Sequence, residues 1–337
     1  MTAATIAPPR ATLAGLRPAL PALALGLIVF AVLFHAEAAA AVRVWIESTA
    51  YNHGFLILPI VAWLLWDRRA VLEGAVARPL PAAALAILPL AAIWLLSDRL
   101  GIMEGRQLAA MSMLQALLLG VLGWRIYRLL LGPLLYLYFL VPFGAFITPA
   151  LQSFTTGFVG HGLDLLGIPN YIDANLIQVP HALFYVAQAC AGLRFLIAAI
   201  AFACLYALLM YRSQRRRAIF IGISLIVPVI ANGLRALGIV VLGYWLGSAK
   251  AAATDHILYG WIFFSIVILL LVLLGLPFRE DLRGWTAPVV ATPPPPAVSP
   301  QAAPPRPLAA ALLVALLAAL GPAASFALHR AAAAALA

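Results

Sequence analysis

Charged residues are scarce in this chain of 337 residues: only 9% are Asp, Glu, Lys or Arg. Hydrophobic residues make up 65%, and the mean hydropathy is +1.05. This composition lies far outside that of a soluble globular domain. The charges gather between apolar runs, as expected when a charge at the bilayer centre costs about 2.5–3.5 kcal/mol. The sequence therefore predicts an all-α polytopic integral membrane protein.

Cysteine is scarce as well. The chain has two cysteines, Cys190 and Cys204, which are too few for a disulfide framework, and it has no Cys/His cluster with metal-ligand spacing. Cys204 lies in the middle of an apolar run, where a cysteine is most often a small packing residue. We expect neither a metal site nor another cofactor.

Nine apolar runs suit membrane-spanning helices, eight in the core and one near the C-terminus. They cover about residues 18–34, 55–66, 81–96, 108–124, 129–147, 195–211, 218–234, 257–276 and 308–328. The first run could instead be a signal peptide, because Ala36-Glu37-Ala38 resembles a small-residue cleavage site. An uncleaved first helix is the preferred interpretation in a chain with so many spans.

Composition divides the chain into a disordered lead (1–17), a main membrane domain (18–284), a Pro-rich linker (285–307) and a C-terminal transmembrane helix with its tail (308–337). The longest region without a clear span precedes Cys190. It has an amphipathic part from Thr148 to Leu166, followed by a turn-rich part that favours β-structure and extends to Pro180. This pattern predicts an ordered loop or hairpin packed over the bundle.

The basic residues predict an orientation. With the N-terminus inside and alternating spans, 13 of the 21 basic residues lie on the inner side, as the positive-inside rule requires. The net charge of +10 then reflects cytoplasmic arginines near anionic lipid, and no nucleic-acid partner is expected. Cys190 and Arg235 fall at the outer ends of their spans. Residues 236–255 are interpreted as a re-entrant or interfacial helix, after which His256 opens the last core span from outside.

Cys190, Arg235 and His256 have the residue types needed for acyl transfer through a thioester. A Cys190 thiolate would attack a peptide carbonyl. His256 would accept the thiol proton and return one to the leaving amine, and Arg235 would bind the developing oxyanion. Arg194 would share a helical face with Cys190 if that stretch is helical, and its charge would favour the thiolate.

Each of these residues also has a simpler interpretation. Cys190 could be a packing residue, Arg235 could extend to the outer headgroups, and His256 could mark an ordinary helix start. Asn232 and His53 are supporting candidates for the same outer face. His53, in the triplet Asn52-His53-Gly54, could equally belong to a helix cap.

The chain resembles the exosortase/archaeosortase family over roughly residues 20 to 280. The stretches that carry the resemblance are Tyr51-Asn52-His53-Gly54-Phe55-Leu56-Ile57-Leu58-Pro59, Trp66-Asp67-Arg68-Arg69, Val186-Ala187-Gln188-Ala189-Cys190-Ala191-Gly192-Leu193-Arg194, Asn232-Gly233-Leu234-Arg235, and His256 with Gly260 and Phe263. The family's cysteine, arginine and histidine fall on Cys190, Arg235 and His256. Its usual serine after the cysteine is replaced by Ala191, which removes one hydroxyl beside the nucleophile.

The resemblance implies a membrane cysteine peptidase or transpeptidase of the bacterial inner membrane, with its site facing the periplasm. Its substrates would be exported proteins with a C-terminal sorting signal, a Pro-Glu-Pro-like motif followed by a transmembrane helix and basic residues. The acceptor could be water, a lipid or a glycan. The rival hypothesis is a transporter or scaffold of a polysaccharide-export system, in which Arg235 and His256 contact an anionic substrate and Cys190 only packs.

Overall fold

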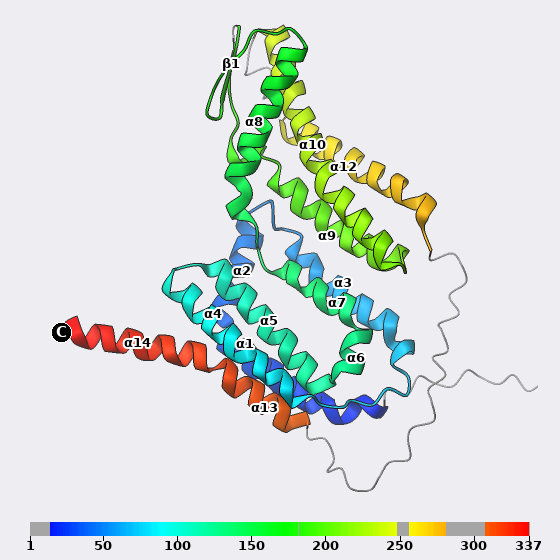
Figure 1. Cartoon of the computed structure of the whole chain (residues 1–337), viewed down its shortest axis with the longest axis vertical. Coiled ribbons are helices and arrows are strands. Elements are labelled where there is room, and N and C mark those ends of the chain that lie inside the picture. Colours follow the sequence, from blue (N-terminus) through cyan, green and yellow to red (C-terminus); the bar gives the residue numbers. More distant parts are fainter. Residues whose placement is uncertain (1–13, 181, 248–255, 281–306, 337) are drawn as a thin grey trace, which may run out of the picture. The chain divides into compact units, whose positions relative to one another are not determined.

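The computed structural model describes residues 14–180, 182–247, 256–280 and 307–336, and these are mostly helical (Figure 1). The chain divides into two compact units. The first comprises residues 1–45, 54–142 and 286–337, and the second comprises 46–53 and 143–285. The prediction of an all-α polytopic bundle is confirmed. Most of the predicted lead and nearly all of the Pro-rich linker lie outside the described residues.

The first unit is a helical bundle with α4 and α5 at its centre. Its α-helices are α1 (Leu20–Leu33), α2 (His35–Glu47, which enters the second unit after Trp45), α3 (Gly54–Asp67), α4 (Ile87–Arg99), α5 (Met103–Leu122), α6 (Trp124–Leu129), α7 (Leu131–Tyr136), α13 (Pro307–Ala318) and α14 (Leu320–Leu336). Short 3-10 helices, η1 (Ala14–Ala19), η2 (Arg68–Leu72), η3 (Pro81–Ala86) and η4 (Leu137–Leu140), connect them. The buried core includes Met113, Leu117 and Val121 on one side of α5 and Val314 of α13.

A charged network lies inside this first unit. Arg106 pairs with Glu37 at 2.6 Å and with Asp98 at 2.9 Å, and Trp94 Nε1 donates to Glu37 Oε1 at 3.0 Å. Ser325 Oγ donates to Asp98 Oδ2. The network joins α2, α4, α5 and α14, so the C-terminal helix is bonded to the bundle of this unit.

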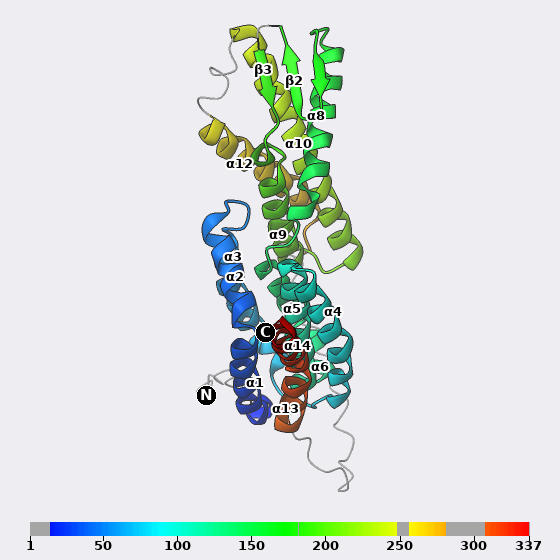
Figure 2. The ribbon, with the colours of Figure 1, turned by 90° about the vertical axis from the view of Figure 1, so that its left-hand side faces the viewer.

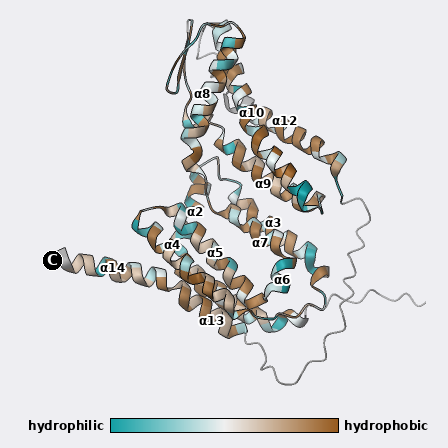
Figure 3. Ribbon diagram, viewed as in Figure 1, coloured by the Kyte–Doolittle hydropathy of each residue, from teal (hydrophilic) through white to brown (hydrophobic). Residues whose placement is uncertain are grey.

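The second unit is organised around the long helix α10 (Gln214–Leu246), which packs against α8 (Thr148–Leu165), α9 (Leu193–Met210) and α12 (His256–Gly275) (Figures 1 and 2). It also contains η5 (Ala145–Ile147), η6 (Gln188–Cys190) and η7 (Leu276–Phe278). Hydrophobic residues cover much of α9 and α12 (Figure 3), and large apolar side chains such as Trp261, Ile266 and Leu270 are exposed along α12. This surface suits contact with lipid.

The ordered segment predicted before Cys190 is present as α8 and a small sheet. Strands β1 (Tyr171–Asp173), β2 (Leu176–Val179) and β3 (Ala182–Tyr185) form an antiparallel sheet in the order β1-β2-β3 (Figure 2). Ile177 and Val179 alternate with exposed residues and are buried. They belong to a core with Val159 of α8 and Val240 of α10, so the sheet rests on these two helices.

The number of spans differs from the expectation of eight core helices and one more. Among the described residues, seven helical runs, including Pro307–Ala334, are long and apolar enough to cross a membrane, or eight if Leu131–Leu140 and Ala145–Leu165 count as one broken span. Helix α3 has only 14 residues, short of the roughly 20 of a straight span. The run expected at 129–147 is interrupted by Pro142 and by Gly144 at φ 115°.

The predicted re-entrant helix after Arg235 is wrong for the described residues. Helix α10 continues without a break through 33 residues to Leu246, about 50 Å at 1.5 Å per residue. That is longer than the roughly 30 Å of a bilayer core. The extra turns are stabilised because Val240 and its neighbours on α10 join the core beneath the sheet. Arg235 therefore lies within a helix and not at its end.

Candidate active site

Cys190 lies in a short turn between the sheet and a membrane helix. Strand β3 leads into the 3-10 turn Gln188–Cys190, where Cys190 N donates to Ala187 O at 2.8 Å. Gly192 then adopts φ 85° and ends the turn, and α9 begins at Leu193. The expected i,i+4 pairing of Cys190 with Arg194 on one helical face is therefore wrong, because the left-handed residue between them interrupts the helix.

Gly192 is required at this turn for two reasons. Its backbone lies in the left-handed region, which L-residues with a side chain rarely adopt. A Cβ at this position would also come within 2.6 Å of Asn232 Cγ on α10. The turn that carries Cys190 can thus approach α10 closely only because residue 192 has no side chain.

Asn232 connects the Cys190 turn to Arg235. Its Nδ2 donates to the backbone carbonyl of Cys190 at 2.9 Å and lies 3.4 Å from Thr155 Oγ1 of α8. Its Oδ1 accepts from Arg235 Nη2 at 3.2 Å. Asn232 is only 2% exposed, so these bonds form away from water, where losing them is costly. The amide thus joins α8, α10 and the Cys190 turn.

Arg235 is 1% exposed, the largest side chain among the fully buried ones in the described part of the chain. Its Cζ lies 5.5 Å from the centroid of the Phe195 ring, and Arg194 Cζ lies 4.7 Å from the same ring. The other partner of Phe195 is Phe264 of α12, whose ring centroid is 4.9 Å away in a stacked arrangement. Two guanidinium groups therefore lie against one aromatic ring, a favourable cation–π arrangement, and both charges are held near the Cys190 turn.

The beginning of α12 packs against both arginines. A Cβ at Gly260 would lie 3.4 Å from Arg194 Nη2 and 3.9 Å from Arg235 Nη1. Helix α12 begins at His256, four residues and about one turn before Gly260. The His256 side chain lies outside the described residues, so its role stays a prediction.

His53 lies at the turn before α3, and the ring nearest to it is that of Tyr51, 6.5 Å away between centroids. Burial lowers the pKa of His53, and a hydrogen bond with the backbone of Ala50 opposes this shift. Within the described residues, no hydrogen bond joins His53 to Cys190 or Arg235. The structure thus brings together Cys190, Asn232, Arg235 and Arg194, without a bond from His53.

Three residues of this site were not singled out in the sequence. Thr155 lies beside Asn232, and the Phe195 ring contacts both arginines. Gln152 Nε2 donates to the carbonyl of Val186 at 2.9 Å, which anchors the chain just before the Cys190 turn. Gln152 and Thr155 belong to the segment from Thr148 to Leu166 that the sequence identifies as amphipathic, and this pattern was the available signal. Phe195 carried none, because phenylalanine is common in membrane helices.

The described residues contain no group of three or more His, Cys, Asp or Glu side chains that could hold a metal ion. The site consists of a cysteine whose carbonyl is bonded to a buried amide, and of two arginines that lie against the Phe195 ring. The Cys190 side chain is partly exposed and also packs against the apolar core beneath the sheet.

The chain matches a known protein family. A profile of the family described as transmembrane exosortase matches residues 45–273, more than half of the chain. The matched region contains Cys190, Arg235 and His256. Neither the curated proteins nor the solved structures yield a match.

Proposed function

We propose, because the chain belongs to the transmembrane exosortase family, that it is a membrane cysteine peptidase or transpeptidase acting on exported proteins with a C-terminal sorting signal. The observation that carries the proposal is the hydrogen-bonded path from the Cys190 carbonyl through Asn232 to the buried Arg235. Such a path fixes a nucleophile and a permanent cation in one geometry. In this proposal the site faces the periplasm from the inner membrane.

The proposed reaction has two steps. In the first, Cys190 Sγ attacks the carbonyl carbon of the scissile peptide bond while His256 accepts the thiol proton. The oxyanion that forms is stabilised by Arg235. When the C–N bond breaks, the leaving amine takes the proton from His256 and a thioester to Cys190 remains. In the second step, water, or an amine or hydroxyl of an acceptor, attacks the thioester and passes its proton through His256 to the departing thiolate.

Local electrostatics support Cys190 as the nucleophile. Arg194 and Arg235 place positive charge beside its turn, and α9 begins three residues later, at Leu193. A helix N-terminus and nearby cations stabilise an anion that forms at such a turn. A substrate anchored by its own transmembrane helix would arrive already confined to the bilayer, which supplies effective concentration without a separate recognition domain.

The test is co-expression of the full chain with an anchored protein that ends in a Pro-Glu-Pro motif, a transmembrane helix and basic residues. We expect Cys190→Ala and Cys190→Ser to abolish processing while the variants accumulate in the membrane at normal levels. Cys204→Ala is the matched control, because it removes the second cysteine of the chain, which lies in α9. This variant should process the substrate normally. The mass of the new substrate C-terminus identifies water or another acceptor. Intact processing by Cys190→Ala would refute the enzyme proposal and favour a transporter or scaffold.

A further inference from the structure

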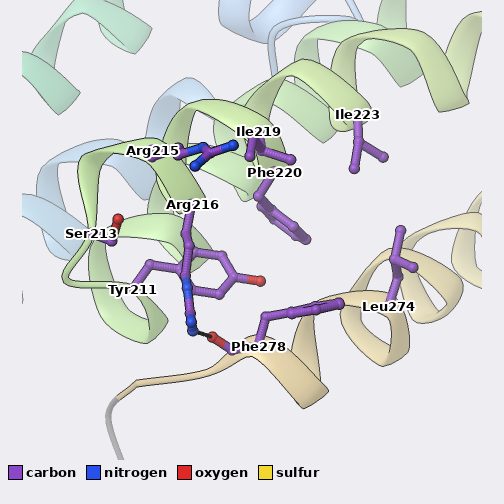
Figure 4. A pocket seen from close by; sticks show the side chains of 9 residues that line it. All are labelled: Tyr211, Ser213, Arg215, Arg216, Ile219, Phe220, Ile223, Leu274 and Phe278. Atoms are coloured by element: carbon purple, nitrogen blue, oxygen red, sulfur yellow. Dashed lines mark hydrogen bonds between the residues drawn. The ribbon is translucent and has the colours of Figure 1, made fainter.

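A cavity of about 620 Å³ lies at the other end of the second unit, where α9 ends, α10 begins and α12 ends (Figure 4). Its volume falls within the roughly 300–1,000 Å³ typical of small-molecule sites. The residues that line it are Tyr211, Ser213, Arg215, Arg216, Ile219, Phe220, Ile223, Leu274 and Phe278. The 18 residues of α9 separate this cavity from the Cys190 turn, about 27 Å at helical rise, so the two sites are distinct.

One end of the cavity is cationic. Arg216 Nη1 donates to Phe278 O at 2.8 Å and pairs with Glu280 Oε1 at 3.3 Å, so this arginine is held in place. Arg215 is exposed and has neither a hydrogen bond nor an ion pair with any described residue. Ser213 precedes the first residue of α10, whose N-terminus adds partial positive charge. The Glu280 carboxylate already accepts from the backbone N–H groups of Arg212 and Ser213, so the uncommitted groups of the described residues at this end are the Arg215 guanidinium and the Ser213 hydroxyl.

The other end of the cavity is apolar. Ile219 and Ile223 follow Arg215 at intervals of four residues, so the three lie along one face of α10. Leu274 of α12 lies across from Ile223 in Figure 4, while the polar groups of Ser213 and Arg216 lie farther along at the helix ends. The cavity thus passes from cationic to apolar over eight residues, about 12 Å.

We propose that this cavity binds one anionic phospholipid. Its phosphate would be bound by Arg215, Ser213 and Arg216, and an acyl chain would lie along Ile219, Ile223 and Leu274. The cavity lies at the ends of three apolar helices, where the headgroups of a surrounding bilayer would meet its hydrocarbon region. A soluble anion would use only the cationic end and would leave the apolar wall uncovered. The site is independent of the chemistry proposed at Cys190.

The experiment uses the purified full chain in detergent after lipid removal, titrated with phosphatidylglycerol or phosphatidylcholine and followed by native mass spectrometry. We expect one phosphatidylglycerol to bind more tightly than phosphatidylcholine. Arg215→Gln should weaken phosphatidylglycerol binding about fivefold, the value of one arginine near an anionic headgroup. Arg125→Gln removes an exposed arginine of α6, outside the cavity, and should bind as the unchanged protein does. Equal affinity for the two lipids, or equal losses in both variants, overturns the proposal.

A second pair of variants tests the apolar wall without altering charge. Ile223→Trp fills the cavity, whereas Ile226→Trp changes an isoleucine of α10 that is 60% exposed and outside the lining. We expect only Ile223→Trp to lose phosphatidylglycerol binding. If Ile223→Trp fails to fold, the proposal is tested by the phosphatidylglycerol affinities of Arg215→Gln and Arg125→Gln alone. Full binding by a folded Ile223→Trp, or complete displacement of the lipid by excess inorganic phosphate, also overturns the proposal.

Discussion

Asn232 Nδ2 donates a hydrogen bond to the backbone carbonyl of Cys190 at 2.9 Å, across 42 residues of sequence. The same amide accepts from Arg235 Nη2 through its oxygen. The position of the candidate nucleophile is therefore set by α10, although Cys190 itself precedes α9. A change in the position of α10 would therefore move Cys190 through its hydrogen bond with Asn232.

Asn232→Ala is expected to lower both stability and processing. It leaves the Cys190 carbonyl and an Arg235 donor without this buried partner, which costs about 1–3 kcal/mol of unfolding free energy. Ser224→Ala is the matched control on α10: Ser224 is 0% exposed, and its hydroxyl has no hydrogen-bond partner among the described residues. Thermal unfolding in detergent and substrate processing should change in Asn232→Ala only. Equal effects of the two substitutions would show that the amide has no special role.

Arg235→Lys should reduce processing almost as much as Arg235→Ala, by about 10²–10³ in rate if the guanidinium is the oxyanion donor. A lysine keeps the charge but loses the planar set of donors that can contact Asn232 and substrate together. Arg194→Lys, which changes the other arginine at the Phe195 ring, is the comparison and should lose much less processing activity. Single-turnover processing rates measure both. Near-normal rates in Arg235→Lys would contradict a donor role.

Gly192→Ala is expected to destabilise the second unit and displace Cys190. The new Cβ would meet Asn232 Cγ at 2.6 Å in addition to straining a residue at φ 85°. Gly167→Ala separates the two effects, because Gly167 has φ 69° with no heavy atom within 4 Å of its Cβ position. Backbone strain alone should cost about 1–2 kcal/mol. Denaturant or thermal midpoints should show a larger loss for Gly192→Ala, and identical losses would rule out the steric contact.

Glu37→Gln tests the charged network of the first unit. Glu37 is 4% exposed and pairs with Arg106 at 2.6 Å. Removing one partner of a buried ion pair costs about 3–5 kcal/mol, and we expect the lower end because Asp98 still pairs with Arg106. Glu104→Gln, on the same helix as Arg106, has no ion pair among the described residues and is the control. A thermal midpoint for Glu37→Gln no lower than that of Glu104→Gln would contradict this estimate.

The contact between the Glu280 carboxylate and the backbone of Arg212 and Ser213 is expected to be sensitive to acid. The backbone N–H groups of Ser213 and Arg212 donate to its carboxylate and, with Arg216 nearby, hold the pKa of Glu280 below its ordinary value of 4.5. Because the folded-state pKa is the lower one, this stabilisation is present above pH 4.5 and is lost as the pH falls through the folded-state pKa. The thermal midpoint of the unchanged protein should therefore fall more steeply below pH 4.5 than that of Glu280→Gln. Parallel curves would contradict the assignment.

Much of this protein could be predicted from sequence because the governing signals are local. Apolar runs and scarce charge determined the membrane class and most helices, and the turn-rich segment before Cys190 determined an ordered β-structure. The residue types at Cys190, Asn232, Arg235 and His256 determined the family resemblance. The wrong prediction also rested on a local signal. The spacing of Cys190 and Arg194 assumed one continuous helix, but Gly192 separates the Cys190 turn from α9.

Only the tertiary structure decided which of these residues meet. The bond between Asn232 and Cys190 exists because α9 and α10 pack side by side, and hydropathy cannot specify which faces they share. The same packing places Arg194 and Arg235 on the Phe195 ring and lets α10 continue beyond Arg235 beneath the sheet. Sequence thus determined the helices and the chemical groups. Side-chain packing between distant segments determined the site, because a buried hydrogen bond depends on positions in space and not on spacing along the chain.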